Sequence, residues 1–407
     1  MPCFGNTHTQ TSANRVIYLD NAATTRVHPE VFDVMRPYFY EKYANPSSSH
    51  PLGQDARAAV EDARETVASA LGCAPEEIIF TSGGTEADNL ALLGAALGNQ
   101  AKGRHVITTA IEHQAILAAA ETLETLGFEV TRLPVDRSCR VRLDALEAAV
   151  RPDTTLVSVM LANNETGSVQ PLDEIISLLK SRGIILHTDA VQAFGKMPIN
   201  VDELGVDLLS LSAHKIHGPK GVGALYVRRG IRVQRLMHGG HQENGRRAGT
   251  ENVPGIVGFA SAVRRAIAWV PNELRRIGEL RDRLESGLVS RLETVRVNAG
   301  DGPRIPTIAN ISFPKIDGNY LLNRLHADGI CVTSGSACAS VQQEPSHVLL
   351  AMGLSSADAQ SSIRFSLSTE TTEADVDAVI ERIVGIFRRV TFTASSATCG
   401  KSITSAA

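Results

Sequence analysis

A lysine and an aspartate follow two apolar runs, where strand ends could present both side chains to a cleft. Lys215 ends the sequence Ser-Leu-Ser-Ala-His-Lys, and Asp189 follows the run at residues 184–188. A partly desolvated lysine amine can form a Schiff base with an aldehyde, and a carboxylate can keep a pyridinium nitrogen protonated. Each residue also has an ordinary interpretation, because most lysines are solvated and Asp is a common helix cap.

A glycine turn at residues 82–89 could hold an anion. It reads Ser-Gly-Gly-Thr-Glu-Ala-Asp-Asn and comes directly after a strand-like run at 78–81. Glycine lets a backbone approach an anion closely, and the free N–H groups of a helix start, with the Thr85 hydroxyl, can bind a phosphate. No Gly-Lys-Ser/Thr follows, so the segment is not a P-loop. An ordinary turn before a helix would have the same sequence.

Three further residues could act on a substrate. His113, just past a strand-like run, could stack on a flat ring and carry protons, or it could cap the following helix. Arg364 lies in the β-rich run 361–366, where its guanidinium suits either a substrate carboxylate or a structural ion pair. Cys338 lies among Ser, Gly and Ala, where an exposed thiol can become a nucleophile or have no role.

The elements that would position these residues alternate between strands and helices. Apolar and β-branched runs predict strands at 78–81, 106–109, 155–160, 184–188, 208–212 and 222–227, and helical periodicity predicts helices at 55–71, 86–97 and 113–126. Such alternation indicates an α/β fold with a mainly parallel sheet covered on both faces. Ligands of these sheets bind beyond the carboxyl ends of the strands.

The last third of the sequence predicts a smaller α+β domain. A long charged helix at 262–291 precedes strands at 308–313, 330–333 and 363–366 and an amphipathic helix at 373–389. We therefore expect a large domain at 16–262 and a small domain at 263–393 that also includes residues 1–15. Residues 394–407 are rich in Ser, Thr and Ala, and we expect them to be disordered.

Composition narrows the classes of function. The chain of 407 residues has a net charge of −4, without a basic stripe, so binding to nucleic acid or to a membrane surface is not expected. No apolar run is long enough for a membrane span, and residues 1–15 lack the apolar core of a secretory signal. Six scattered cysteines predict neither a disulfide scaffold nor a zinc site. These features favour a location of the protein in the reducing cytoplasm.

Taken together, these segments resemble the cysteine desulfurases, in particular the NifS/IscS-like group of the class-V aminotransferases. The matching segments occur in the family's order at residues 19–25, 81–89, 112–113, 163–167, 188–192, 212–215, 247–252, 334–338 and 361–366. The resemblance implies the type I fold of enzymes that use pyridoxal 5′-phosphate (PLP), with a mainly parallel seven-stranded sheet in the large domain.

The resemblance also implies the roles of the candidate residues. Lys215 would bond to PLP, His113 would stack on the ring and carry protons to and from sulfur, and Cys338 would accept the sulfur. Asn164 and Arg364 would hold the substrate carboxylate, and Asn164 would contact PLP as well. The other contacts to PLP would come from Gly84, Thr85, Ser212, His214 and, from a neighbouring subunit, Thr250 for the phosphate, and from Asp189 and Gln192 for the ring.

The activity implied is conversion of L-cysteine to L-alanine, with sulfur transferred to an enzyme cysteine for iron–sulfur cluster assembly or other sulfur delivery. A homodimer and a sulfur-acceptor protein are implied as partners. The alternatives are a selenocysteine lyase, another PLP enzyme of this fold, or an interaction protein without catalysis. No resident metal is expected, and a transient contact of Cys338 with an iron–sulfur cluster stays open. Residues 395–407 do not resemble the tail that docks a scaffold protein, and Cys331 and Cys399 have no implied role.

Overall fold

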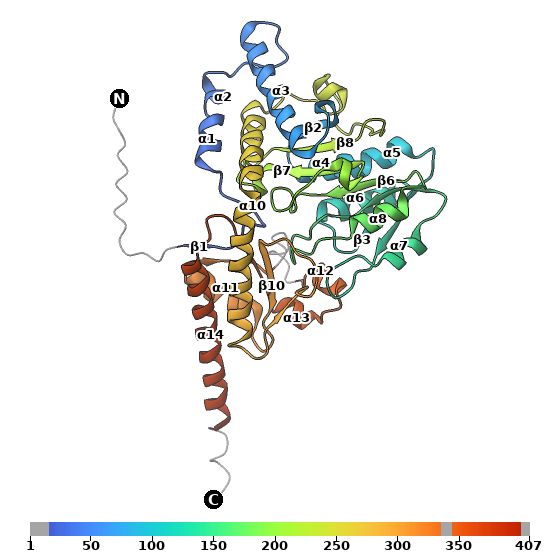
Figure 1. The fold of residues 1–407 in the computed structure, drawn as a ribbon. Coiled ribbons are helices and arrows are strands. Elements are labelled where there is room, and N and C mark those ends of the chain that lie inside the picture. Colours follow the sequence, from blue (N-terminus) through green and yellow to red (C-terminus); the bar gives the residue numbers. More distant parts are fainter. Residues whose placement is uncertain (1–15, 335–343, 400–407) are drawn as a thin grey trace, which may run out of the picture.

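The computed structural model describes residues 16–334 and 344–399, in which a seven-stranded sheet forms the centre of the large domain (Figure 1). The strands lie in the order β2-β8-β7-β6-β5-β3-β4. Their bounds are β2 Ile78–Thr81, β3 His105–Thr109, β4 Glu129–Leu133, β5 Thr154–Ser158, β6 Ile185–Asp189, β7 Leu208–Ser212 and β8 Gly223–Val227.

The direction of the strands brings several of their ends to one edge of the sheet. β8 runs antiparallel to both β2 and β7, whereas β7, β6, β5, β3 and β4 pair in parallel. The carboxyl ends of β2, β3, β5, β6 and β7 therefore meet at the same edge, where the sequence predicts ligand binding. The expected α/β fold with a mainly parallel sheet is confirmed.

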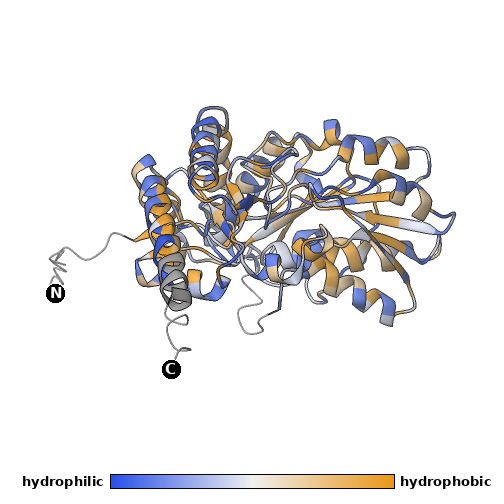
Figure 2. Ribbon diagram, turned by 90° about the horizontal axis from the view of Figure 1, so that it is seen from below, coloured by the Kyte–Doolittle hydropathy of each residue, from blue (hydrophilic) through white to orange (hydrophobic). Residues whose placement is uncertain are grey.

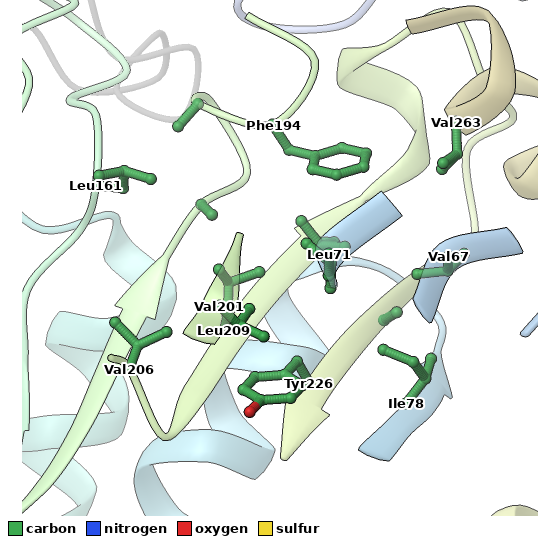
Figure 3. Close-up of a cluster of buried hydrophobic side chains, with 14 of the residues drawn as sticks. Val67, Leu71, Ile78, Leu161, Phe194, Val201, Val206, Leu209, Tyr226 and Val263 are labelled. Carbon is green, nitrogen blue, oxygen red and sulfur yellow. The ribbon is translucent and has the colours of Figure 1, made fainter. Parts of the chain in front are cut away.

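Alternate strand residues supply two separate cores on the two faces of the sheet. Ile78 and Phe80 belong to one buried cluster, while Ile79 between them belongs to the other. Figure 3 shows the first cluster, where Leu71, Leu209 and Tyr226 lie together. Figure 2 shows hydrophobic residues concentrated on the strands, with both kinds of residue on the surrounding helices.

Helices cover both faces, as a mainly parallel sheet requires. The first cluster receives side chains from α3 (Pro51–Leu71), α7 (Leu143–Ala149), α8 (Leu172–Leu179) and α10 (Val253–Val289). The second receives them from a helical run of α4 (Gly84–Asn89), a π-helical turn (Leu90–Gly94) and α5 (Ala95–Asn99), and from α6 (Gln114–Thr125). The remaining helices of the large domain are α1 (Pro29–Met35), α2 (Pro37–Tyr40) and α9 (Val201–Leu204).

The small domain has its own buried cluster beside two short sheets. β12 (Ser362–Ser366), β10 (Ile308–Ser312) and β9 (Arg296–Val297) form an antiparallel sheet, and β1 (Ile17–Tyr18) pairs in parallel with β11 (Ile330–Cys331). The helices here are α11 (Gly318–Ala327), α12 (His347–Ala351), α13 (Ser356–Gln360) and α14 (Glu373–Cys399).

Helix α10 belongs to both domains. Phe259 and Ala266 pack in the core of the large domain, whereas Ile277 and Leu284 pack in that of the small domain. In the described part of the chain, no single helix has the length and apolar composition to cross a membrane. The two parts of α10 reach the length and apolar composition of a membrane span only when they are taken together. Both parts contribute side chains to the two buried cores.

Two helices extend beyond the bounds that the sequence predicts. α10 begins at Val253, nine residues before the expected start at 262, and α14 continues to Cys399, ten residues past the expected end at 389. Residues 394–399 are therefore helical where we expected disorder. The reason is that no Gly or Pro interrupts the stretch before Gly400, and Ser and Thr weaken a helix only slightly.

Candidate active site

A cavity of about 310 Å³ lies at the carboxyl edge of the large sheet, against β12 of the small domain. Its wall brings together ten of the residues that the sequence predicts for the site: Gly84, Thr85, His113, Asn164, Asp189, Gln192, Ser212, His214, Lys215 and Arg364. They come from the last residues of β6 and β7, from the segments that follow β2, β3, β5, β6 and β7, and from β12. Residues that are up to 280 positions apart in the chain thus meet around one space (84 to 364).

Lys215 ends a short 3₁₀ turn, Ala213–Lys215, that directly follows β7. Its Nζ donates hydrogen bonds of 2.7 Å to the carbonyl oxygens of Ala22 and Ala23. These carbonyls belong to the segment after β1, so the amine is fixed where that segment crosses the edge of the sheet. The lysine is therefore part of a cavity wall and not a solvated surface side chain.

Asp189 is the last residue of β6, and its side chain is buried at the base of the cavity. Its Oδ1 accepts a 2.8 Å hydrogen bond from the N–H of Val191. Loss of hydration raises the pKa of Asp189, and the charges of His113 and Lys215 partly oppose that shift. The carboxyl therefore stabilises the turn and, in addition, would gain from a cationic ring nitrogen in the cavity.

His113 is both the cap of α6 and a wall of the cavity. Its Nδ1 accepts a 3.1 Å hydrogen bond from the N–H of Ala115, so the neutral ring carries its proton on Nε2. Burial lowers its pKa, and Lys215 and His347 lower it further while Asp189 opposes them. Both interpretations of this residue hold, because the cap fixes the tautomer of a ring that lines the cavity.

The glycine turn before α4 leaves little room beside the cavity. Gly83 has φ 151° and ψ −178°, a conformation essentially restricted to glycine. A Cβ on Gly84 would lie 2.9 Å from Cγ2 of Val191 and 3.5 Å from Cβ of Ser212. With the Thr85 hydroxyl and the first N–H groups of the helix nearby, the turn forms a cradle that suits a phosphate.

Arg364, on β12, is buried at 2% exposure and reaches the cavity from the small domain. One guanidinium nitrogen donates to the carbonyl oxygen of Asn164 at 2.9 Å, and another donates to Oδ1 of Asp20 at 2.8 Å. The side chain is therefore in an ion pair, as the ordinary interpretation expects. It also presents positive charge at the cavity, where a carboxylate could bind.

Sequence reasoning missed the following residues of the cavity wall: Ala22, Ala23, Asp88, Gln114, Met160, Glu165, Val191 and His347. Asp88 and Glu165 lie within segments that match the family, so their position there was an available signal. His347 lies in the run Pro-Ser-His-Val-Leu at 345–349, which also resembles the NifS/IscS-like group, so the same signal was available for it. Its Nε2 donates to the carbonyl oxygen of Glu112 at 3.0 Å.

One predicted residue of the described chain is not part of this wall, and another lies where the structure describes nothing. Thr250 is exposed on the segment before α10, and Cys338 lies outside the described residues.

Among the described cysteines, burial raises the pKa of Cys73 and of Cys139 to about 12, so neither thiol is suited to act as a nucleophile at neutral pH. The described residues contain no cluster of three or more His, Cys, Asp or Glu that could hold a metal ion.

A lysine amine, a buried carboxylate and an anion cradle around one cavity define a cofactor-dependent enzyme of the aminotransferase type. The sequence matches the family described as Aminotransferase class-V over residues 17–379, and the chain belongs to this family. Its enzymes depend on PLP, and this chain shares that dependence. The cavity fits the cofactor, because Gly84 leaves space that a side chain would fill and Asp189 offers a carboxyl to a ring nitrogen.

The sequences of proteins named as cysteine desulfurases are similar to this chain over most of its length. A protein from Dictyoglomus turgidum named cysteine desulfurase IscS is 48% identical over 379 residues, 92% of this chain and 96% of the relative. A cysteine desulfurase from Trichormus azollae is 50% identical over 375 residues, 92% of this chain and 94% of the relative. A solved NifS-like protein from Rickettsia africae has a TM-score of 0.84 at 33% identity, covering 92% of this chain and all of that one.

Proposed function

We propose that this chain is a cysteine desulfurase that converts L-cysteine to L-alanine and transfers the sulfur to its own Cys338. The observation that carries the proposal is the single cavity that joins Lys215, Asp189, His113 and Arg364. Relatives that share 47–50% identity over most of the chain are named cysteine desulfurases, which supports the same activity here.

The residues of the cavity would hold PLP by three groups of contacts: to its phosphate, to its pyridine nitrogen and, through the amide of Gln192, to its ring oxygen. Gly84 and Thr85 at the helix start, with Ser212 and His214, would hold the phosphate, and burial lowers the pKa of His214 to about 4, so its imidazole is neutral. Asp189 would hold the pyridine nitrogen. When bound, the cofactor supplies an electron sink that makes the Cα proton labile and the C–S bond of the substrate breakable.

The substrate would be held and deprotonated by residues of both domains. Arg364 and Asn164 would bind its carboxylate, which fixes the Cα–H bond near the amine of Lys215. Lys215 Nζ would take the Cα proton and later return a proton to carbon. His113, with its proton on Nε2, would move a proton to or from the substrate sulfur.

The sulfur step balances without any further oxidant or reductant. The thiolate of Cys338 attacks the sulfur of the substrate, an S–S bond forms, and the C–S bond breaks. Its electron pair remains on carbon, which takes up a proton to become the methyl group of alanine. The enzyme thiol thereby becomes a persulfide, and a second protein accepts the sulfur.

The two described ends of the Cys338 segment both lie at the cavity, which supports this role. The N–H of Arg364 donates to the carbonyl oxygen of Thr333 at 2.7 Å. At the other end, the hydroxyl of Ser346 donates to Oε2 of Glu165 at 2.5 Å. Five residues can span at most about 18 Å from Thr333, so Cys338 belongs to a segment that begins within reach of the cavity.

Alanine formation from cysteine without any keto acid tests the proposal. The parental enzyme should form alanine, and Cys338→Ser should keep the bound cofactor but lose this product by at least about a hundredfold. Cys331→Ser is the matched control, because Cys331 lies half-buried on β11, and it should retain activity. Parental activity in Cys338→Ser would refute the assignment of the nucleophile, and transamination dependent on a keto acid would refute the reaction.

A homodimer would complete the site. Large apolar side chains are exposed on and beside α1 and α2: Phe32, Phe39, Tyr40, Tyr43 and Leu52. The neighbouring Pro46 and Ser47 share a cavity of about 700 Å³ with Gln242 and Glu251, next to exposed Thr250. These exposed apolar side chains and Thr250 support a surface on which a second copy docks.

Mixed dimers test this arrangement. A Lys215→Ala chain and a Thr250→Ala chain are co-purified as a mixed dimer. If Thr250 acts across the interface, one of the two sites combines the intact Lys215 of one chain with the intact Thr250 of the other. The account predicts that such dimers regain activity that neither parent dimer has. A monomeric active enzyme in sedimentation experiments would contradict it.

The sulfur acceptor would be a protein of iron–sulfur cluster assembly or of another sulfur-delivery route. The described cysteines Cys73, Cys139 and Cys331 are free thiols, which fits a reducing cytoplasm. Capture of partners on the enzyme loaded with L-cysteine, compared with Cys338→Ser, should retain an acceptor only on the loaded enzyme. Equal capture by both would refute an acceptor that recognises the persulfide.

A further inference from the structure

A second lysine lies behind the wall that carries Lys215. Lys196 follows β6 by seven residues, and its Nζ donates a 2.9 Å hydrogen bond to Oε1 of Gln192. Nε2 of Gln192 donates a 2.9 Å hydrogen bond to the carbonyl oxygen of Ala22. The same carbonyl accepts the 2.7 Å hydrogen bond from Nζ of Lys215. The two lysines are therefore joined through one side-chain amide and one backbone carbonyl.

The two neighbours of Gln192 fix which way its amide points. A lysine ammonium only donates, so the atom that faces a charged Lys196 must be the amide oxygen. A backbone carbonyl only accepts, so the atom facing Ala22 must be the amide nitrogen. Gln192 is buried and lines the cofactor cavity, and the amide nitrogen keeps a second N–H beyond the one used by Ala22.

Lys196 lies near two other cations, Lys215 on the 3₁₀ turn and Arg364 on β12. His214 and His217 come from the same turn and the residues after it, and burial lowers the pKa of each. Glu273 on α10 lines a small second cavity together with Lys196. Loss of hydration, with the charges of Lys215 and Arg364, lowers the pKa of Lys196 to about 7. The bond to Gln192 survives in either state, because a neutral amine still has N–H groups to donate.

We propose that Lys196 is a positioning residue for the cofactor: it holds the Gln192 amide so that an N–H group, and not the amide oxygen, faces the ring oxygen of PLP. The proposal rests on the assignment of Gln192 to that oxygen under the proposed function. Without Lys196 only the carbonyl of Ala22 opposes a rotation that would present the amide oxygen, which would repel an anionic ring oxygen.

The absorbance of the resting enzyme tests the proposal without turnover. In Lys196→Met the ring oxygen loses its donor and a nearby positive charge, and both changes make it hold a proton more tightly. The midpoint of the pH titration of the cofactor band should therefore move to higher pH, by about half a unit or more, and cofactor affinity should fall. Lys196→Arg should restore both, because it again donates to the amide oxygen.

A double-mutant cycle separates positioning from direct charge. If Lys196 acts through Gln192, the shift caused by Lys196→Met in a Gln192→Ala background is less than half of the shift in the parent. Equal shifts in both backgrounds, or a parental titration in Lys196→Met, would overturn the proposal. If Lys196→Met fails to fold, Lys196→Gln replaces it in the cycle. A glutamine amide can both donate and accept, so it does not fix the orientation of the Gln192 amide.

Two controls keep this test distinct from that of the proposed function. Lys102→Met removes an exposed lysine in the turn after α5 and should leave the titration unchanged. The absorbance of the cofactor is measured in the absence of L-cysteine. The titration therefore tests the role of Lys196 even if the substrate of the enzyme is not cysteine. A parental protein that binds no PLP would overturn the cofactor assignment and this inference together.

Discussion

At the scale of single residues, the site depends on ionisable groups that have lost water. Asp88, Glu112 and Asp189 are buried carboxyls whose pKa values all rise through loss of hydration. On the same β6 strand, burial lowers the pKa of His187 to about 3. Asp88 and Asp189 line the cavity itself, and carboxyls displaced from their ordinary protonation states at a cavity are typical of a catalytic site.

Glu112 makes the stability of the fold depend on pH. Burial raises its pKa from 4.5 to about 8, and its Oε1 accepts hydrogen bonds from the Thr109 hydroxyl and the N–H of Met160. Below pH 4.5 both folded and unfolded states hold the proton. Between 4.5 and about 8 only the folded state does, so this contribution to stability is lost as pH rises.

Glu112→Gln should therefore raise the melting temperature at pH 8 and have little effect near pH 4.5. The amide keeps the acceptor oxygen and removes the charge that must otherwise be neutralised. Melting curves of the holoenzyme from pH 4.5 to 8.5 measure the difference between variant and parent. A difference that is constant with pH would contradict the assignment of this titration to Glu112.

Arg364 should govern the affinity for the substrate. Arg364→Lys keeps the positive charge but loses the planar fork, and we expect KM for cysteine to rise about ten- to hundredfold with the cofactor retained, since bonds to charged groups contribute about 1.5–3 kcal/mol. Steady-state kinetics separate this effect from one on kcat. Arg132→Ala, which breaks an ion pair with Glu124 on the surface, should leave KM unchanged. An unchanged KM in Arg364→Lys would exclude the role.

At the scale of elements, the cofactor site is built from turns whose packing leaves room for a ligand. Gly84→Ala adds a methyl group 2.9 Å from Val191, so the cradle must narrow or shift. We expect weaker binding of PLP, by about tenfold, measured as the dissociation constant of the apoenzyme. Gly385→Ala on α14 meets no atom within 4 Å and should not change it. Equal affinity for both variants would rule out the cradle.

A buried ion pair fixes the segment before α10 that carries Thr250. Arg64 on α3 donates to both carboxylate oxygens of Glu243 at 2.7 and 2.9 Å, and the N–H of Phe80 on β2 donates to the same carboxylate. Arg64→Met should lower the free energy of unfolding by about 3–5 kcal/mol, because it leaves a buried carboxylate unpaired.

Urea unfolding of Arg64→Met, Glu243→Gln and the double variant measures the coupling of this pair. The double variant should be more stable than the sum of the two single effects predicts. Purely additive effects would show that the two side chains do not stabilise the segment together.

The sequence predicts most elements near the site, and it fails where local signals are weak. β2 and β7 begin and end where their apolar runs predict. β4 was not predicted, because Glu129-Val-Thr-Arg-Leu133 is a polar strand that pairs only with β3 at the edge of the sheet. The start of α10 was misjudged although it carries a local signal, the Asn252 cap followed by a proline, and the end of α14 was misjudged because no Gly or Pro interrupts the helix between 390 and 399.

At the scale of the whole molecule, the site exists because two domains meet. The large sheet supplies Lys215, Asp189 and His113, while the small domain supplies Arg364 and His347. The family motifs placed the first four of these, because their order along the chain is informative without coordinates. His347 was not predicted, and its position at the wall depends on how α12 docks against the large domain.

The central claim is that cleavage of the C–S bond beside Lys215 places one sulfur atom on Cys338. Mass spectrometry of peptides from the holoenzyme, taken after brief exposure to L-cysteine and blocking of thiols, tests it most directly. The account predicts one added sulfur on the peptide that contains Cys338, together with alanine, and neither in Lys215→Ala. Alanine formed without that sulfur, or sulfur found on the peptide of Cys331 instead, would contradict it.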